Sequence, residues 1–433
     1  MALNILKQRL ILGITHHFQI VKLPKYLCRM AIQRKIINDP VHGFITINHP
    51  LLFKIIEHPY FQRLRRIKQM AMASLVYPGA VHTRLHHALG AYHLMCCAVN
   101  ELKDKGVEIT ADEELAVKCA MLLHDIGHGP FSHALEQILV KGTRHEQLSL
   151  QIMQLMNEEL NGALQLTIDI FIGNYRKPFL HQLISGQLDM DRMDYLSRDS
   201  FFTGVSEGII GYNRILKMLD VRGNQLVVEE KGIQSVEKFL IARRQMYWQV
   251  YLHKTVIAGE KMLVKILQRA REIFDLNDEQ ILLHSPLDFF FGKFNGTIDN
   301  AALQLFCSLD DVDIEFAIKK WSRHPDRVLS MLSKNLLNRK LLKCKLEAEP
   351  FDEKFFDEQI AKAVAQFSVS TKEAEYFVFT GEASNTIYDI SDENILILTK
   401  ENEVKEISEM ENTLIHKTLS TPVKKCYICY PKN

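Results

Sequence analysis

The stretch LLHDIGHGPFSH, residues 122–133, joins an apolar run to side chains that bind metals and phosphates. The segment before it, ADEELAVKCAMLL (111–123), begins with acidic residues, as helix first turns favour, and then becomes almost wholly apolar. This pattern predicts a buried helix that delivers His124 and Asp125 to a cavity at its end. A histidine nitrogen beside a carboxylate oxygen suits a divalent ion such as Mn, Fe, Zn, Ni or Mg.

Two ligands are too few to hold an ion, so further ligands must come from other segments. The segment RLHHALG (84–90) supplies two histidines, and QLDMDRMDYLSRD (187–199) supplies several aspartates. For any one cluster, the alternative is that a buried histidine and aspartate only form a hydrogen bond with each other. Three separate clusters in a chain with 18 histidines favour a metal site.

The composition describes an ordinary globular protein, because 53 basic and 52 acidic residues leave a net charge of +1. This balance argues against nucleic acid or a membrane surface as a partner. No run approaches the ~18 apolar residues of a membrane span. Eight sparse cysteines indicate a reducing, cytoplasmic location, and the CxxC of Cys426 and Cys429 lacks a second pair to complete a zinc site.

The chain is expected to be mostly α-helical and to divide into four regions. Residues 1–34 form an N-terminal extension without a clear signal peptide, and Met30 is an alternative start. Residues 35–275 form a helical core with short β-hairpins. Within this core, residues 235–274 contain no proline and are predicted to form one helix. A helical accessory region (276–346) and a small α/β C-terminal region (347–433) follow.

Six segments of the chain carry a family resemblance. HDIGHGPFSH and its flanking blocks resemble the HD-domain metal-dependent phosphohydrolases, and among them the deoxynucleoside triphosphate triphosphohydrolase branch. The likeness continues less densely to about residue 345, and we expect no SAM domain ahead of it. The matching blocks are NDPVHGFITINHPLL (38–52), FQRLRRIKQM (61–70), PGAVHTRLHHALG (78–90), HDIGHGPFSH (124–133), RHEQ (144–147) and DMDRMDYLSRD (189–199).

The resemblance implies an HD-domain helical core with a divalent metal ion and a set of residues around the phosphates. The general acid is His133, with His128 on a phosphate and His145 and Glu136 orienting water or His133. Glu136 and Arg192 depart from the Asp and Lys of the SAM-and-HD-domain members. The implied metal ligands are His87, His124, Asp125 and Asp191, and the implied phosphate-binding cations are Arg84, Arg192 and Arg243.

The resemblance also implies a deoxyribose site. Tyr195 and Asp199 follow Asp191 at helical spacing, and Asp199 is expected to bind the 3′-hydroxyl. Gln69 and Met70 would crowd the 2′ face and exclude ribonucleotides. Two tyrosines complete the implied site, Tyr251 and Tyr247, of which Tyr247 replaces a histidine of the SAM-and-HD-domain members.

Finally, the resemblance implies a homo-oligomer, a dimer or a tetramer, that binds an activating nucleotide between subunits. The alternative is that the residues at these positions are ordinary solvated surface residues, because lysines and arginines are common on protein surfaces. The matching positions are Lys35, Asn38, Arg65, Arg214, Lys231 and Lys254, together with Glu57 in place of Asp.

Three functions remain open from the sequence. The first is hydrolysis of deoxynucleoside triphosphates to deoxynucleoside and triphosphate. The second is an HD phosphohydrolase for nucleoside monophosphates or a cyclic nucleotide, and the third is a non-catalytic nucleotide sensor. The full ligand set and His133 argue against the sensor. The several cations favour the triphosphate, because a monophosphate needs fewer.

Overall fold

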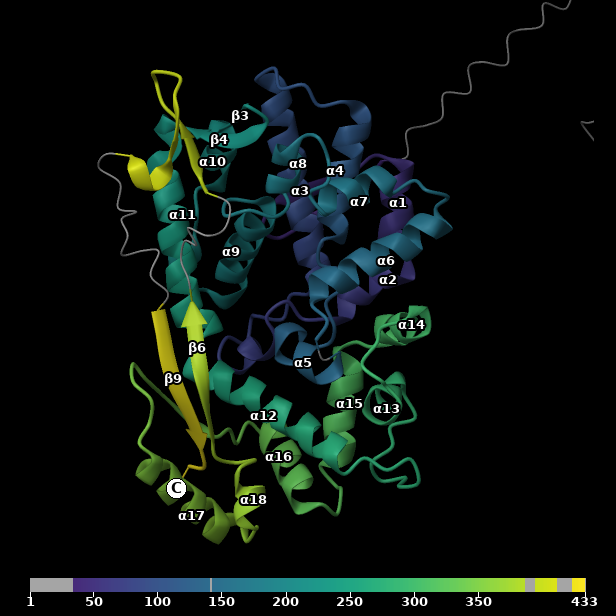
Figure 1. Ribbon diagram of the computed structural model, residues 1–433, viewed down its shortest axis with the longest axis vertical. Helices are drawn as coiled ribbons and strands as arrows, with labels where there is room; N and C mark the ends of the chain where they lie inside the picture. The colour runs from purple at the N-terminus through teal and green to yellow at the C-terminus, as the bar shows by residue number, and fades with distance from the viewer. Residues whose placement is uncertain (1–33, 141, 386–393, 411–422, 433) are drawn as a thin grey trace, which may run out of the picture.

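The computed structural model describes residues 34–140, 142–385, 394–410 and 423–432. It confirms a mostly helical fold with small sheets of short strands (Figure 1). The predicted N-terminal extension, apart from Arg34, and the choice between Met1 and Met30 lie outside the described residues. Three helices form the centre of the fold, because α3 (Arg84–Asp104) packs against both α4 (Ala111–Leu123) and α9 (Met190–Thr203).

Helix α4 is the buried helix predicted before the HD dipeptide. It begins in a capping box, in which the Thr110 hydroxyl accepts from the Glu113 backbone and Glu113 accepts from the Thr110 backbone. Its last residues are fully buried, and His124 is its C-terminal cap. The apolar run therefore anchors the helix in the core, and its end carries His124 and Asp125 to a common site.

Helices α3 and α9 approach each other closely at Gly90. A Cβ atom added to Gly90 would lie 2.1 Å from Asp194 Oδ1 and 2.0 Å from Arg198 Nη2. Asp194 and Arg198 are one helical turn apart on α9, and both are fully buried. Because no side chain larger than hydrogen fits at residue 90, the two helices can bring their polar residues together here.

The single helix predicted for residues 235–274 is wrong, because two helices occupy this range. Helix α11 (Ile233–Met246) passes into a π-helical turn (Tyr247–Tyr251), and α12 (Lys254–Glu272) begins after it. His253 has an extended backbone, and its ring accepts from the Thr255 N–H as the N-terminal cap of α12. The local cap thus outweighs the helical propensity of the uninterrupted sequence.

The remaining helices surround this centre. The hairpin of β1 (Lys35–Asp39) and β2 (Gly43–Ile47) leads into α1 and α2, and α15 and α16 lie in the accessory region that was predicted to be helical. Helix α12 packs against α16, and α17 and α18 lie at the C-terminal end (Figure 1). These helices are α1 (Pro50–Glu57), α2 (Pro59–Arg63), α5 (Glu136–Leu139), α6 (His145–Glu159), α7 (Gln165–Phe171), α8 (Pro178–Gln182), α10 (Tyr212–Met218), α13 (Pro286–Gly292), α14 (Asn300–Ser308), α15 (Asp311–Trp321), α16 (Arg327–Leu337), α17 (Glu353–Phe367) and α18 (Thr371–Ala374).

Three small sheets complete the described part of the chain. One is the antiparallel hairpin of β1 (Lys35–Asp39) and β2 (Gly43–Ile47). A second has the order β3-β4-β7-β8, so that β7 of the C-terminal region pairs with β4 of the core in parallel. The third has the order β5-β9-β6. The other strands are β3 (Leu219–Arg222), β4 (Gln225–Glu229), β5 (Lys343–Glu347), β6 (Phe379–Asn385), β7 (Leu396–Leu398), β8 (Val404–Glu406) and β9 (Val423–Tyr430).

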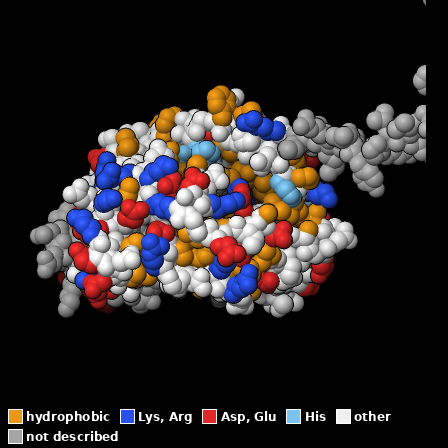
Figure 2. Space-filling view, turned by 90° about the horizontal axis from the view of Figure 1, so that it is seen from above, with side chains coloured by type: hydrophobic (Ala, Val, Ile, Leu, Met, Phe, Trp, Pro, Cys, Tyr) orange, Lys and Arg blue, Asp and Glu red, His pale blue; other side chains and the backbone are white. Residues whose placement is uncertain are grey.

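The surface agrees with the balanced charge of the sequence. Figure 2 shows a face on which basic and acidic side chains are interspersed. In the part of the chain that the structure covers, no helix is long and apolar enough to cross a bilayer.

Replacement of Gly90 by alanine should destabilise the protein by about 1–3 kcal/mol, because the methyl group would collide with the buried Asp194 and Arg198 side chains. At an exposed helical position the same change would instead stabilise by up to ~1 kcal/mol. Urea unfolding of Gly90→Ala measures the difference. Gly211→Ala is the matched control, because Gly211 has a negative φ and no atom within 4 Å of an added Cβ. Equal stability of both variants would contradict the close approach.

Candidate active site

The predicted metal ligands converge at the meeting point of α3, α4 and α9. His87 Nε2 lies 3.3 Å from His124 Nε2 and 3.0 Å from Asp191 Oδ1. His124 Nε2 lies 3.5 Å from the same Asp191 oxygen. The candidate donor atoms of these three residues all lie within 4.8 Å of one another, which fits a shared ion. Asp125 adjoins the group, with Oδ1 3.5 Å from His124 Nε2 and Oδ2 3.7 Å from His87 Nε2.

Hydrogen bonds on the far side of each ring orient the two histidines. His87 Nδ1 lies 2.7 Å from Asp194 Oδ2, and His124 Nδ1 lies 2.7 Å from the carbonyl oxygen of Met121. Both contacts place the ring proton on Nδ1, because the partners are acceptors, and this leaves the Nε2 lone pairs for an ion. The donor set and its orientation therefore fit a divalent metal.

Burial and charge act against each other in this cluster. Burial disfavours protonation of His87, but hydrogen bonds with Asp191 and Asp194 raise its pKa to about 10. Burial would raise the pKa of Asp191, but hydrogen bonds with His124 and His87 lower it. The carboxylates of Asp191 and Asp194 stay charged, and without an ion they favour protonation of His87. A bound cation would replace that proton.

Next to the metal group, Asp125 connects to residues that face the substrate space. Its carboxylate pairs with Arg84 Nη1, and its Oδ1 lies 3.3 Å from His128 Nε2. Burial, followed by the charge of Arg84, holds the pKa of His128 well below its ordinary value. His128 therefore faces the cavity as a neutral imidazole, stacked on the ring of His145 at a centroid distance of 4.0 Å.

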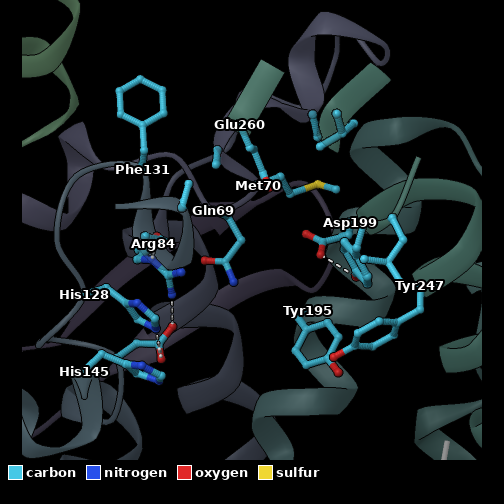
Figure 3. A pocket seen from close by; sticks show the side chains of 18 of the residues that line it. Gln69, Met70, Arg84, His128, Phe131, His145, Tyr195, Asp199, Tyr247 and Glu260 are labelled. Carbon is cyan, nitrogen blue, oxygen red and sulfur yellow. Dashed lines mark hydrogen bonds and ion pairs between the residues drawn. The ribbon is translucent and has the colours of Figure 1, made fainter. Parts of the chain in front are cut away.

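These residues line one cavity of about 440 Å³. Arg84, His128 and His145 lie on one side of it, and Asp199, Tyr195 and Tyr247 lie on the other (Figure 3). The structure thus brings together predicted residues that lie far apart in the sequence of the core region, from Gln69 to Tyr251. Those that line the cavity are Gln69, Met70, Arg84, Asp125, His128, His145, Asp191, Arg192, Tyr195, Asp199, Arg243, Tyr247 and Tyr251.

The side of the cavity away from the metal group carries an ordered set of hydroxyl and carboxylate groups. Asp199 Oδ2 accepts from the Tyr251 hydroxyl at 2.7 Å, and its Oδ1 lies 2.7 Å from His82 Nε2. The π-helical turn places Tyr247 and Tyr251 in edge-to-face contact, with ring centroids 5.1 Å apart. Gln69 Oε1 is buried without a hydrogen-bond partner in the described residues, so it is available to a ligand.

Two of the predicted catalytic side chains, those of His133 and Glu136, lie outside the described residues. The backbone at residue 133 belongs to a short 3-10 helix (Ser132–Ala134), and both of its end residues line the cavity. The assignment of His133 as general acid remains a prediction.

Several buried polar residues that the sequence analysis did not single out support the loop after α4. Arg63 is fully buried and donates from Nη2 to the carbonyl oxygens of Ile126 and His128, at 2.9 Å each. The Ser149 hydroxyl donates to the His124 carbonyl at 2.8 Å and accepts from the Gly127 N–H. A buried arginine has no sequence signature of its own, so only the tertiary contacts reveal it.

The residues predicted for an activating nucleotide do not meet in one cavity of the described chain. Lys35 pairs with Glu57, and Arg214 Nη2 donates to the Lys231 carbonyl at 3.1 Å. Lys254 lines a separate cavity of about 650 Å³ with β5 and α17. Arg65 bonds to Gln62, and Asn38 is exposed on β1. A site between subunits would need a second copy to join these groups.

Comparisons with known proteins agree with the fold. The HD domain model matches residues 84–199, and the model of the HD associated region matches residues 210–290. The crystal structure of a phosphohydrolase from Bacteroides thetaiotaomicron superimposes with a TM-score of 0.87 and is 50% identical, covering 92% of this chain and 100% of that one. The uncharacterised protein YwfO of Bacillus subtilis is 32% identical over 392 residues, 87% of each chain.

The helical core and the His/Asp group define an HD-type hydrolase site. This chain belongs to the HD-domain phosphohydrolases. Within that family it resembles the deoxynucleoside triphosphate triphosphohydrolase SAMHD1 of Gallus gallus, with 32% identity over 286 residues. That match spans 56% of this chain and 46% of the chicken protein.

Loss of the Asp191 carboxylate should remove most of the bound metal, because the only candidate carboxylate ligand left beside His87 and His124 is Asp125, whose charge is shared with Arg84. Mass spectrometry of purified Asp191→Ala should find less than about a tenth of the wild-type metal content. Loss of a residue that only supports a metal ligand already lowers metal affinity by about tenfold or more. Glu158→Gln, an exposed change on α6, is the control and should keep full content. Full metal content in Asp191→Ala with an unchanged fold would refute the ligand assignment.

Proposed function

We propose that this phosphohydrolase converts deoxynucleoside triphosphates to deoxynucleoside and inorganic triphosphate. The observation that carries the proposal is one cavity that joins a His/Asp metal group, three arginines and a hydroxyl-binding carboxylate. The metal ion would be Mn, Fe, Mg, Ni or Zn, held by His87, His124, Asp125 and Asp191. When bound, it would polarise a phosphate oxygen and lower the pKa of a coordinated water.

At the phosphate end, the residues of this chain neutralise and orient the substrate. Arg84 is fixed by Asp125 and by the Ser132 hydroxyl, which accepts from its Nε at 2.8 Å. Arg192 is fixed by Asp189, and Arg243 lies over the Tyr247 ring. Fixed guanidinium groups suit the several negative charges of a triphosphate, because planar pairs of N–H donors match phosphate oxygens.

Hydrolysis breaks the bond between the α-phosphorus and the 5′-oxygen. Water supplies the new oxygen on phosphorus, and the departing 5′-oxygen takes a proton. Neutral His128 is proposed to donate its N–H to a phosphate oxygen, and His133 is proposed to protonate the leaving oxygen. His145, stacked on His128, and Glu136 are proposed to orient these groups.

At the sugar end, Asp199 is proposed to accept from the 3′-hydroxyl. Tyr251 and His82 hold its two oxygens in place, so the carboxylate is oriented before the substrate binds. Tyr195 and Tyr247 flank the ring, and Gln69 and Met70 are proposed to occupy the space of a 2′-hydroxyl.

The assembly and activation of the enzyme remain proposals that rest on the resemblance. We infer a homo-oligomer, a dimer or a tetramer, in the cytoplasm, with an activating nucleotide bound between subunits. The separate positions of Lys35, Arg214 and Lys254 within one chain are compatible with a site that a second copy completes.

Product analysis decides the reaction. Each of the four deoxynucleoside triphosphates, incubated with the enzyme and Mn²⁺ or Mg²⁺, should yield deoxynucleoside and tripolyphosphate by ion-exchange chromatography. Asp191→Ala should abolish both products, and Glu158→Gln should leave them unchanged. Monophosphate with pyrophosphate would instead show attack at another phosphorus. Turnover of only monophosphates or a cyclic nucleotide would favour the second candidate.

Recognition of the 3′-hydroxyl by Asp199 can be measured with 2′,3′-dideoxynucleoside triphosphates. The wild-type enzyme should disfavour them by about tenfold or more in kcat/KM, because the buried carboxylate would lose a hydrogen bond. In Asp199→Ala the deoxy and dideoxy substrates should become nearly equal. Tyr251→Phe, which keeps the carboxylate, should retain part of the preference. Undiminished discrimination in Asp199→Ala would disprove the assignment.

A further inference from the structure

One cavity residue, Glu260, has no part in the proposed reaction. It lies on α12, one turn beyond Val256, and Leu252 precedes Val256 by the same four residues. Val256 and Glu260 therefore line the cavity from one face of α12, and Leu252 lines it from the turn that precedes the helix. The apolar wall of the cavity consists of the apolar residues that line it, which are Ala71, Ala73, Phe131, Ala134, Leu252 and Val256.

Glu260 lies away from the phosphate end of the cavity. In Figure 3, Glu260 and Met70 lie at the top of the cavity, apart from His128 and His145 on its left. The sugar residues Asp199 and Tyr247 lie on the adjoining side. A nucleotide with its phosphates at the metal group and its sugar at Asp199 has only its base left to place. The apolar wall beside Glu260 is the remaining part of the same cavity.

The Glu260 carboxyl group lacks internal support. It has no hydrogen-bond partner within the described residues, and Lys261 acts on it only through its charge. Burial raises the pKa of this carboxyl to about 7. Glu260 is partly exposed, so its unpaired carboxyl oxygens are accessible from the cavity. In ligand sites such groups are often the few polar atoms that select the ligand in an otherwise apolar cavity.

We propose that the apolar wall receives the nucleobase and that Glu260 reads its hydrogen-bonding edge, favouring guanine over thymine. This inference rests on the proposed function. Guanine presents two adjacent N–H donors, at N1 and N2, which match the two oxygens of a carboxylate. Thymine presents one N–H between two carbonyl oxygens, and these oxygens would face the carboxylate. Flat apolar walls with one edge-reading polar group are a general way to recognise a base.

Steady-state kinetics with the four deoxynucleoside triphosphates tests the inference, at about pH 8 so that the carboxyl group is mostly ionised. The wild-type kcat/KM should be higher for the guanine substrate than for the thymine one. Glu260→Gln should lower the guanine value about tenfold, because one acceptor becomes a donor that faces an N–H. The thymine value should stay constant or rise. Glu260→Leu should remove the preference among bases.

The matched control is Gln268→Leu, an exposed polar-to-apolar change on the same helix, which should alter no base preference. Thermal melting verifies that each variant is folded. An unchanged base ranking in both Glu260 variants, or an equal loss for all four bases, would overturn the inference but leave the proposed function intact. Absence of any deoxynucleoside triphosphate hydrolysis by the wild type would overturn both.

Discussion

The buried carboxylate of Asp194 is the contact on which the site depends. It pairs with Arg198 through Nε at 2.9 Å, with His42 Nε2 at 2.7 Å and with His87 Nδ1 at 2.7 Å. Arg198 in turn donates to Asp39 on β1 at 2.8 Å. Burial would raise the pKa of Asp194, but the charge of Arg198 and these hydrogen bonds hold it well below its usual value. One ionised group thus connects the β1–β2 hairpin, α3 and α9.

This network is stabilising only as a complete set. Removal of one partner would leave an uncompensated buried charge, at a cost of about 3–5 kcal/mol. The same set determines the orientation of His87, because Asp194 holds the Nδ1 proton and turns Nε2 toward His124 and Asp191. The requirement for Gly90 has the same origin, since α3 must approach α9 closely enough for these bonds to form.

The loop after α4 is constrained in a second way. Its carbonyl groups are held by Arg63 and Ser149, and the Phe131 N–H donates to Asp311 at 2.8 Å. Phe131 and Ser132 both adopt positive φ, at 50° and 45°, which is strained for side chains of this kind. The surrounding hydrogen bonds maintain this conformation. Ser132 is thereby placed against Arg84, and both residues line the cavity.

Much of the fold and site could be predicted because it depends on local patterns. The acidic start and apolar body of 111–123 predicted α4. Helical spacing placed Asp191, Tyr195 and Asp199 on one face of α9, and all three line the cavity. The break at His253 was missed, because a histidine cap and a π-helical turn are weak signals inside a sequence with high helical propensity.

The sequence by itself determined the helical class and the HD family, and it indicated a ligand set and the residue types suited to phosphate chemistry. These follow from residue identity and short-range spacing, together with the family resemblance. The tertiary structure alone decided which buried polar groups support them. These groups are Arg63, Asp194 and Arg198. Each forms hydrogen bonds with residues that lie 63 to 246 positions away in the sequence. It also decided that Glu260 lines the cavity, because one glutamate among the charged residues of an amphipathic helix does not reveal which space it faces.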